Sequence, residues 1–243
     1  MRNTSPGANL IFVMNRYLIC AGALLASLPF STGCFPVEDS CNIKTDGLYL
    51  QLEAIEEDGN VEAQAIFWVG SGPGGTYLEL GDCGDSISVN GQTMNASPGF
   101  DNPEIYVASI EPAASYSFEL VRPDEDPYVS TVSNSRAAVT VTAPNDVTVS
   151  RAEALEVVWE NNDAGEAEVT VSGACFYGFS DNVQDDGAFS VAPGSLDATD
   201  DEAMETCNAT VVVDRVSPGA MANGLDGDIR AVSRGRGEFT STP

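Results

Sequence analysis

Six cysteines are the residues of this chain whose chemistry follows most directly from their positions. Cys20 and Cys34 belong to the N-terminal region, and the other four are spread over the rest of the sequence: Cys41, Cys83, Cys175 and Cys207. A cysteine beside an export signal can receive a lipid, and cysteines in an oxidising compartment form disulfides. The chain has neither a Cys-x-x-Cys motif nor a histidine, so we predict no metal site and no cofactor.

The absence of histidine removes several classes of enzyme. Ser-His-Asp and Cys-His nucleophilic catalysis, histidine metal sites and histidine pH switches all need an imidazole. A glycosidase-type reaction needs only two carboxyl groups, but the sequence offers 37 acidic residues and no way to select a pair. We therefore predict a protein without catalytic residues and keep an acid-pair hydrolase as the third hypothesis.

Residues 1–33 have the composition of an export signal. A positive charge at Arg16 precedes an apolar run from Tyr17 to Phe30, which is shorter than the roughly 20 apolar residues that a membrane-spanning helix needs. Residues 1–13 lie before a second methionine, Met14. They are interpreted as a start-site extension, with a long charged region of the signal as the alternative.

The end of this segment, Ser31-Thr32-Gly33-Cys34, resembles the lipobox of bacterial lipoproteins. The resemblance implies cleavage before Cys34 and attachment of acyl chains to that cysteine, which would anchor the protein to a membrane. Ser31 stands where the family usually has an aliphatic residue, so ordinary signal-peptidase cleavage at the same bond is the alternative. Residue 35 is Phe rather than Asp, which by this resemblance implies the outer membrane or the cell surface.

Cysteine parity favours lipidation. If Cys34 carries a lipid, four cysteines remain for two disulfides, and three connectivities are possible. Because one pair falls in each half of the chain, the pairs Cys41 with Cys83 and Cys175 with Cys207 are favoured. Each bridge closes a loop long enough to contribute about 3 to 4 kcal/mol on the chain-entropy model.

The charge of the chain restricts its partners. The formal net charge is −27, and all the acidic residues follow Gly33. Such a chain repels phosphate backbones, so nucleic-acid binding is not expected. Three acidic clusters could supply oxygen ligands to calcium but fit no calcium-loop motif, and they are interpreted as solvated loop residues: Asp181 with Asp185 and Asp186, Asp200 with Asp201 and Glu202, and Asp226 with Asp228. The expected partners are a membrane, through the N-terminal lipid, and a protein or glycan of unknown identity.

Short segments of alternating or β-branched residues, separated by Gly, Pro, Asn and Asp, predict an all-β protein. Hairpin turns are expected at Glu57-Asp58-Gly59-Asn60 and Asn90-Gly91, and the last two strands are expected near 229–232 and 237–240. We expect two tandem antiparallel β-sandwich domains, 34–134 and 135–243, with one short helix within Asp197–Thr206. The second half, with Val139–Pro144 followed by Leu155–Trp159, resembles immunoglobulin-like and fibronectin type III-like modules of bacterial surface proteins. This resemblance implies a scaffold and carries over no active site.

The two tryptophans differ in their position relative to the apolar faces. Trp159 shares the apolar face of its strand and is expected in a core, whereas Trp68 lies opposite the face formed by Ala63, Ala65 and Phe67. An exposed Trp68 could stack on a sugar ring.

The sequence leaves two noncatalytic functions open. The leading hypothesis is a noncatalytic, lipid-anchored envelope protein for display, adhesion or assembly. A carbohydrate-binding lipoprotein that uses Trp68, Tyr49 and Tyr77 is second. A β-bulge at Trp68, or its burial against the other domain, is the alternative to exposure.

Overall fold

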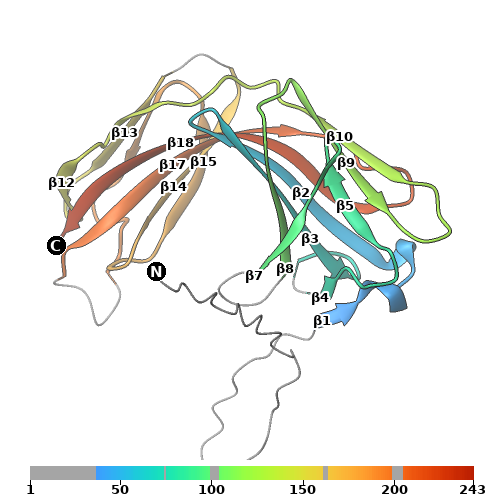
Figure 1. The fold of residues 1–243 in the computed structure, drawn as a ribbon. Coiled ribbons are helices and arrows are strands. Elements are labelled where there is room, and N and C mark those ends of the chain that lie inside the picture. The colour runs from blue at the N-terminus through green and yellow to red at the C-terminus, as the bar shows by residue number, and fades with distance from the viewer. Residues whose placement is uncertain (1–36, 74, 99–103, 161–163, 199–204) are drawn as a thin grey trace, which may run out of the picture. The chain divides into compact units, whose positions relative to one another are not determined.

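The described part of the chain is built almost entirely from β-strands (Figure 1). The computed structural model describes residues 37–73, 75–98, 104–160, 164–198 and 205–243. The strands form three sheets, called here A, B and C, and two 3-10 turns, η1 (Ser40–Asn42) and η2 (Thr45–Gly47), follow the first strand. The expected all-β class is confirmed. The expected helix within Asp197–Thr206 falls largely outside the described residues.

Sheet A has eleven strands. In order across the sheet they are β1 (Val37–Asp39), β4 (Thr76–Glu79), β3 (Asn60–Val69), β2 (Leu48–Glu57), β18 (Asp226–Thr242), β17 (Cys207–Pro218), β14 (Glu166–Gly173) and β15 (Phe179–Gln184). Three more strands join this path: β8 (Glu104–Ile110) beside β3, β7 (Asn95–Pro98) beside β8, and β12 (Val147–Ser150) beside β18.

The two smaller sheets are antiparallel. Sheet B has the order β10 (Tyr128–Ser133), β9 (Ser115–Val121), β5 (Ser86–Val89) and β6 (Gln92–Thr93). Sheet C has the order β11 (Val141–Ala143), β13 (Leu155–Trp159) and β16 (Ala188–Val191).

Strand β18 joins the two ends of sheet A. It pairs antiparallel with β17 from Arg230 to Ser241. On its other side, its first half pairs parallel with β2, and its last residues pair parallel with β12. Figure 1 shows β17 and β18 as long neighbouring strands that connect the β2–β3 region to the β14–β15 region. Sheet A is therefore a mixed sheet that draws strands from both halves of the sequence.

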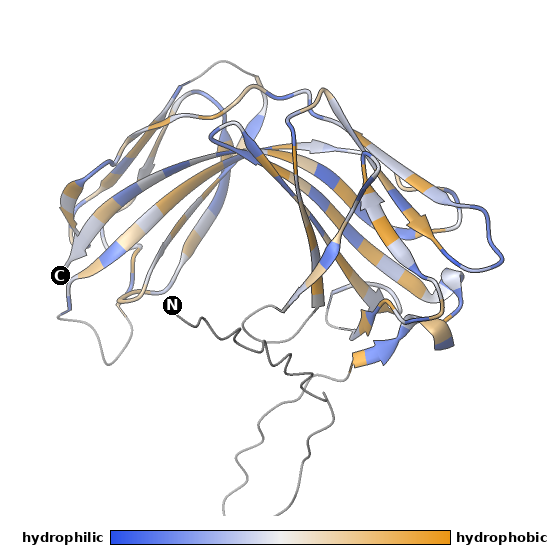
Figure 2. Ribbon diagram, viewed as in Figure 1, coloured by the Kyte–Doolittle hydropathy of each residue, from blue (hydrophilic) through white to orange (hydrophobic). Residues whose placement is uncertain are grey.

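Two hydrophobic cores lie on one face of sheet A. The first contains Leu50 and Phe67 from sheet A and Phe118 from sheet B, and the second contains Val211 from sheet A and Val157 from sheet C. Figure 2 shows the hydrophobic and hydrophilic residues that alternate along the strands. Because alternate residues point to opposite faces of a strand, the same alternation places side chains such as Gln51 and Glu53 of β2 on the other face of sheet A.

The two cores do not divide the chain at the expected boundary near residue 134. Ile229 and Ala231 lie in the predicted second domain, yet they are buried in the first core. Residues Cys34–Pro243 also form one compact unit. Sandwich-like layers are present, but two tandem, purely antiparallel immunoglobulin-like domains are not confirmed because the large sheet is shared and mixed.

Local sequence signals predicted the turns correctly. Asp58-Gly59 connects β2 to β3 and Asn90-Gly91 connects β5 to β6, and all four residues have positive φ angles between 47° and 79°. This backbone conformation is typical of two-residue hairpin turns and favours Asn, Asp and Gly. The expected separate strands near 229–232 and 237–240 are one continuous strand, β18, and the sequence did not predict β15.

The two disulfides join the pairs that the sequence favours. Cys41 is bonded to Cys83, and Cys175 is bonded to Cys207, each with a Cα–Cα distance of 5.8 Å. The first ties the segment after β1 to the β4–β5 connection, and the second ties the end of β14 to the start of β17. Each bridge therefore stabilises one end of sheet A.

A buried ion pair lies at the junction of β17 with the second core. The Arg215 side chain is completely buried, and its guanidinium donates two hydrogen bonds to the Asp185 carboxylate, at 2.6 and 2.9 Å. The guanidinium also donates hydrogen bonds to the carbonyl oxygens of Ala137, Ala138 and Glu160. The Trp159 indole donates a further hydrogen bond of 2.8 Å to Asp185. The pair is thus fully hydrogen-bonded, which a buried charge requires.

The environment of Asp185 sets the pH range in which this pair stabilises the fold. Burial alone would raise the pKa of Asp185, but the hydrogen bonds from Arg215 and Trp159 and the charge of Arg215 outweigh it, so the pKa is lowered. An unfolded aspartate titrates near pH ~3.9. The ion pair therefore stabilises the fold fully above about pH 4, and this stabilisation is lost as the pH falls through the lowered pKa of Asp185 in the folded protein.

We predict that Arg215→Met lowers the free energy of unfolding by about 3–5 kcal/mol, because it leaves the buried Asp185 without its main partner. Urea unfolding at pH 7 measures this loss. The matched control is Arg236→Met, which removes an exposed ion pair with Glu57 (2.7 Å) and should cost about 1 kcal/mol or less. Equal losses for the two variants would contradict a structural role for the buried pair.

Candidate functional site

The free face of sheet A carries the residues that the sequence singled out as possible ligand contacts. Tyr49 on β2 is the Cα partner of Trp68 on β3, and Trp68 is the partner of Tyr77 on β4. The three therefore form one row across adjacent strands, called here the aromatic row. The Tyr49 and Trp68 ring centroids are 5.9 Å apart and edge-on, and those of Trp68 and Tyr77 are 5.8 Å apart.

Trp68 is on the expected face but is not exposed. Only 4% of the residue is accessible to solvent, and the β2–β3 register runs without a break, so no bulge turns the side chain inward. The two tyrosine rings lie on either side of the indole, and both tyrosines are partly accessible. Burial beside these tyrosines, rather than a β-bulge, explains the low exposure of Trp68.

Two polar features distinguish the aromatic row from an ordinary apolar cluster. The Trp68 indole nitrogen is buried and has no hydrogen-bond partner among the described residues. The Tyr49 hydroxyl donates a short hydrogen bond to the Asp228 carboxylate on the neighbouring strand, β18. Buried indole N–H groups usually find an acceptor, so the row has an unused donor beside a half-buried phenol. Whether these residues contact a ligand stays a prediction.

A ladder of ion pairs continues from the aromatic row along β18. The Nη2 atom of Arg230 lies 2.5 Å from Oε1 of Glu53, and the Arg234 guanidinium donates two hydrogen bonds of 2.6 and 2.8 Å to the Asp214 carboxylate. The next pair along the strand joins Arg236 to Glu57. These arginines are neutralised by neighbouring carboxylates, so the face offers polar contacts rather than a free positive patch.

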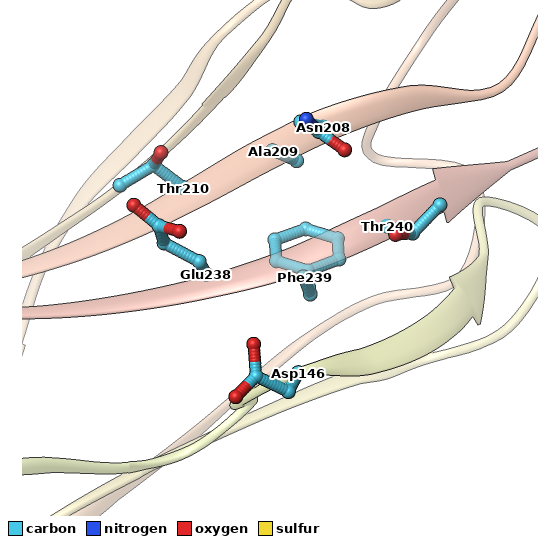
Figure 3. A pocket seen from close by; sticks show the side chains of 7 residues that line it. All are labelled: Asp146, Asn208, Ala209, Thr210, Glu238, Phe239 and Thr240. Carbon is cyan, nitrogen blue, oxygen red and sulfur yellow. The ribbon is translucent and has the colours of Figure 1, made fainter.

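A groove of about 350 Å³ lies where the start of β17 and the end of β18 meet the turn before β12 (Figure 3). It contains two acidic side chains, Asp146 before β12 and Glu238 on β18, and Thr210 on β17 is the Cα partner of Glu238. Both acids are exposed to solvent. A glycosidase general acid is instead enclosed by apolar surroundings. The sequence could not have selected this pair, because only the β17–β18 register and the position of β12 bring these residues together.

The acidic clusters considered as ion ligands are separated in the fold. Asp185 is engaged by Arg215, and Asp228 accepts the hydrogen bond from Tyr49. Residues 200–202 lie outside the described residues. Across the described ranges, no group of three or more His, Cys, Asp or Glu side chains is arranged to hold a metal ion.

Comparison with protein-family models and with curated protein sequences finds no match for this chain. Within the described residues, no helix has the length and apolar character needed to cross a membrane. The fold and its free face therefore define an all-β, disulfide-bonded protein with two cores on one shared sheet.

We predict that Tyr49 ionises at a higher pH than an ordinary tyrosine. The hydrogen bond to Asp228 contributes most to its raised pKa, followed by burial and by the charges of Asp228 and Asp226. Asp228→Ala should bring this pKa back toward ~10. Absorbance titration of the phenolate measures the change.

Tyr128 provides an internal reference for this titration. Its pKa is also raised, mainly by its hydrogen bond to Glu125, a contact that Asp228→Ala does not touch. If the alkaline titration curve of Asp228→Ala superimposes on that of the unmodified protein, the Tyr49–Asp228 hydrogen bond does not form in solution.

Proposed function

We propose that this protein is a noncatalytic, lipid-anchored component of a bacterial cell envelope. Cys34 would carry the lipid, and the all-β body would serve display, adhesion or assembly at the outer membrane or cell surface. We further propose that each core is an immunoglobulin-like sandwich module, modified by the shared strands β17 and β18.

The disulfide pattern is the observation that carries this proposal. Five cysteines follow the signal-like segment, and the two disulfides use four of them. The fifth, Cys34, is the residue that the lipobox resemblance marks for acylation. Disulfides persist in oxidising compartments such as the periplasm and the cell surface, which an exported protein reaches.

The free face of sheet A supports a binding role rather than catalysis. Its central part is occupied by arginine–carboxylate pairs, and its acidic groove is open to solvent. Such a face suits contact with a polar surface. The high negative charge would also keep the body soluble and separate from anionic neighbours.

Glycan binding is the second candidate, and the aromatic row is the observation that favours it. The partly accessible Tyr49 and Tyr77 lie beside the unpartnered indole N–H of Trp68, so the row combines apolar rings with a hydrogen-bond donor. Glycan-array binding by the purified body that is lost in Tyr77→Ala would support this candidate. An array without any binding would contradict it.

We predict that the mature protein begins at Cys34 and carries acyl chains. Intact mass spectrometry should show a mass above that of residues 34–243, and the protein should enter the detergent phase in Triton X-114 partitioning. The control variant Cys34→Ala keeps both disulfides and should remain in the aqueous phase. A mature protein whose mass is fully accounted for by amino acids and two disulfides would contradict lipid anchoring and favour ordinary cleavage at the same bond.

A further inference from the structure

The first strand of the body begins only three residues after Cys34. Phe35 and Pro36 are the only residues between Cys34 and Val37, where β1 starts. An extended chain advances at most ~3.3–3.6 Å per residue, so the Cα atoms of Cys34 and Val37 can be no more than about 11 Å apart. A lipid on Cys34 would therefore hold β1 next to the membrane surface.

Several contacts fix β1 and the residues that follow it to the body. β1 pairs in parallel with β4, and the Cys41–Cys83 disulfide ties the next turn to the β4–β5 connection. The Gly81 amide donates a 2.9 Å hydrogen bond to the hydroxyl of Ser40. Strand β1 and the turn after it are therefore held to the edge of sheet A by backbone, disulfide and side-chain contacts.

A buried arginine strengthens this attachment from the opposite side. Arg122, at the end of β9, donates hydrogen bonds to the carbonyl oxygens of Ser40 (2.8 Å) and Ile43 (2.9 Å) and to the hydroxyl of Thr45 (3.1 Å). The N-terminal segment is thus bound to both sheet A and sheet B. The position of the lipid would determine the orientation of the whole first core.

The aromatic row starts at this same edge. Val37 is the Cα partner of Tyr77, which is the partner of Trp68. Neighbouring strands are ~4.7–4.9 Å apart, so β3, which carries Trp68, lies about 10 Å from β1. Val37 is 42% exposed, so an apolar side chain is accessible at this edge.

The composition of this edge fits the interface between lipid and water. Trp and Tyr are enriched at the headgroup level of membranes, where the rings meet apolar atoms and the N–H and O–H groups meet polar ones. The buried indole N–H of Trp68 has no acceptor among the described residues. Acidic residues such as Glu38 and Glu79 lie at the same edge, so zwitterionic rather than anionic headgroups are the matching surface.

We infer that, in the lipidated protein, the β1–β4 edge of sheet A rests on the zwitterionic headgroup layer of the membrane, with Val37 and Tyr77 in contact and Trp68 directly behind them. The inference rests on the proposed acylation of Cys34. It adds an orientation: the first core is proximal to the membrane, and the second core, which contains Trp159, is more distant.

The two tryptophans of the chain provide the test. Trp159→Phe leaves Trp68 as the only tryptophan, which is excited selectively over the tyrosines at long wavelength, and Trp68→Phe leaves Trp159, which is buried in the second core. The full lipidated protein is inserted into phosphatidylcholine vesicles that contain a lipid spin-labelled near its headgroup. We expect the labelled lipid to reduce Trp68 fluorescence at least twofold and to leave Trp159 fluorescence nearly unchanged. Equal quenching of the two tryptophans overturns the inference.

A second pair of variants tests the contact surface itself. Val37→Asp in the Trp159→Phe protein should reduce the quenching, because it places a charge on the side chain that meets the headgroups and leaves the tyrosines beside Trp68 in place. Val147→Asp is the matched control, since Val147 is 46% exposed but lies on β12, which pairs with the end of β18 beside the second core. Urea midpoints verify that each variant is folded. Unchanged quenching in Val37→Asp overturns the inference.

Intact mass spectrometry of the same samples separates the two proposals. A mature protein without acyl chains overturns the anchoring and, with it, the orientation. An acylated protein with equal quenching of Trp68 and Trp159 overturns only the orientation and leaves lipid anchoring in place.

Discussion

The fold depends on the backbone pairing of β18. This one strand pairs with β17 along most of its length, with β2 along its first half and with β12 at its end. Its core-facing side chains change from Ile229 and Ala231 in the first core to Phe239 in the second. Because one strand contributes to both cores, the position of one sandwich-like layer on sheet A constrains the position of the other.

Several arginines among the described residues of this acidic chain link separate segments of the structure. Arg215 on β17 binds Asp185, the residue that follows β15. Arg122, which follows β9 of sheet B, binds Ser40 of the N-terminal segment. A third, Arg151, is buried and donates a hydrogen bond to the carbonyl oxygen of Glu205. Arg230, Arg234 and Arg236 pair with carboxylates on β2 and β17. Cationic side chains thus connect segments of a chain whose other charges repel one another.

Local patterns in the sequence predicted the all-β class, the hairpin turns and the face on which Trp68 lies. They could not predict that β2 pairs with β18, because alternation assigns residues to faces but does not choose partners distant in sequence. The same limit applies to Trp68, whose burial depends on tyrosines from the two adjacent strands. One available signal was missed: Arg215 has the same phase as Val211 and Val213, so a buried acidic partner was required. Nothing local identified that partner as Asp185.

The position of β18 in the sequence has a consequence for the order of folding. The first core needs residues 226–234 to fill its place beside β2, so a nascent chain that has completed the first 134 residues still lacks a strand of that core. Domains that fold as units usually do so as soon as they leave the ribosome. Because β18 contributes to both cores, neither core is filled before Asp226–Thr242 has been synthesised.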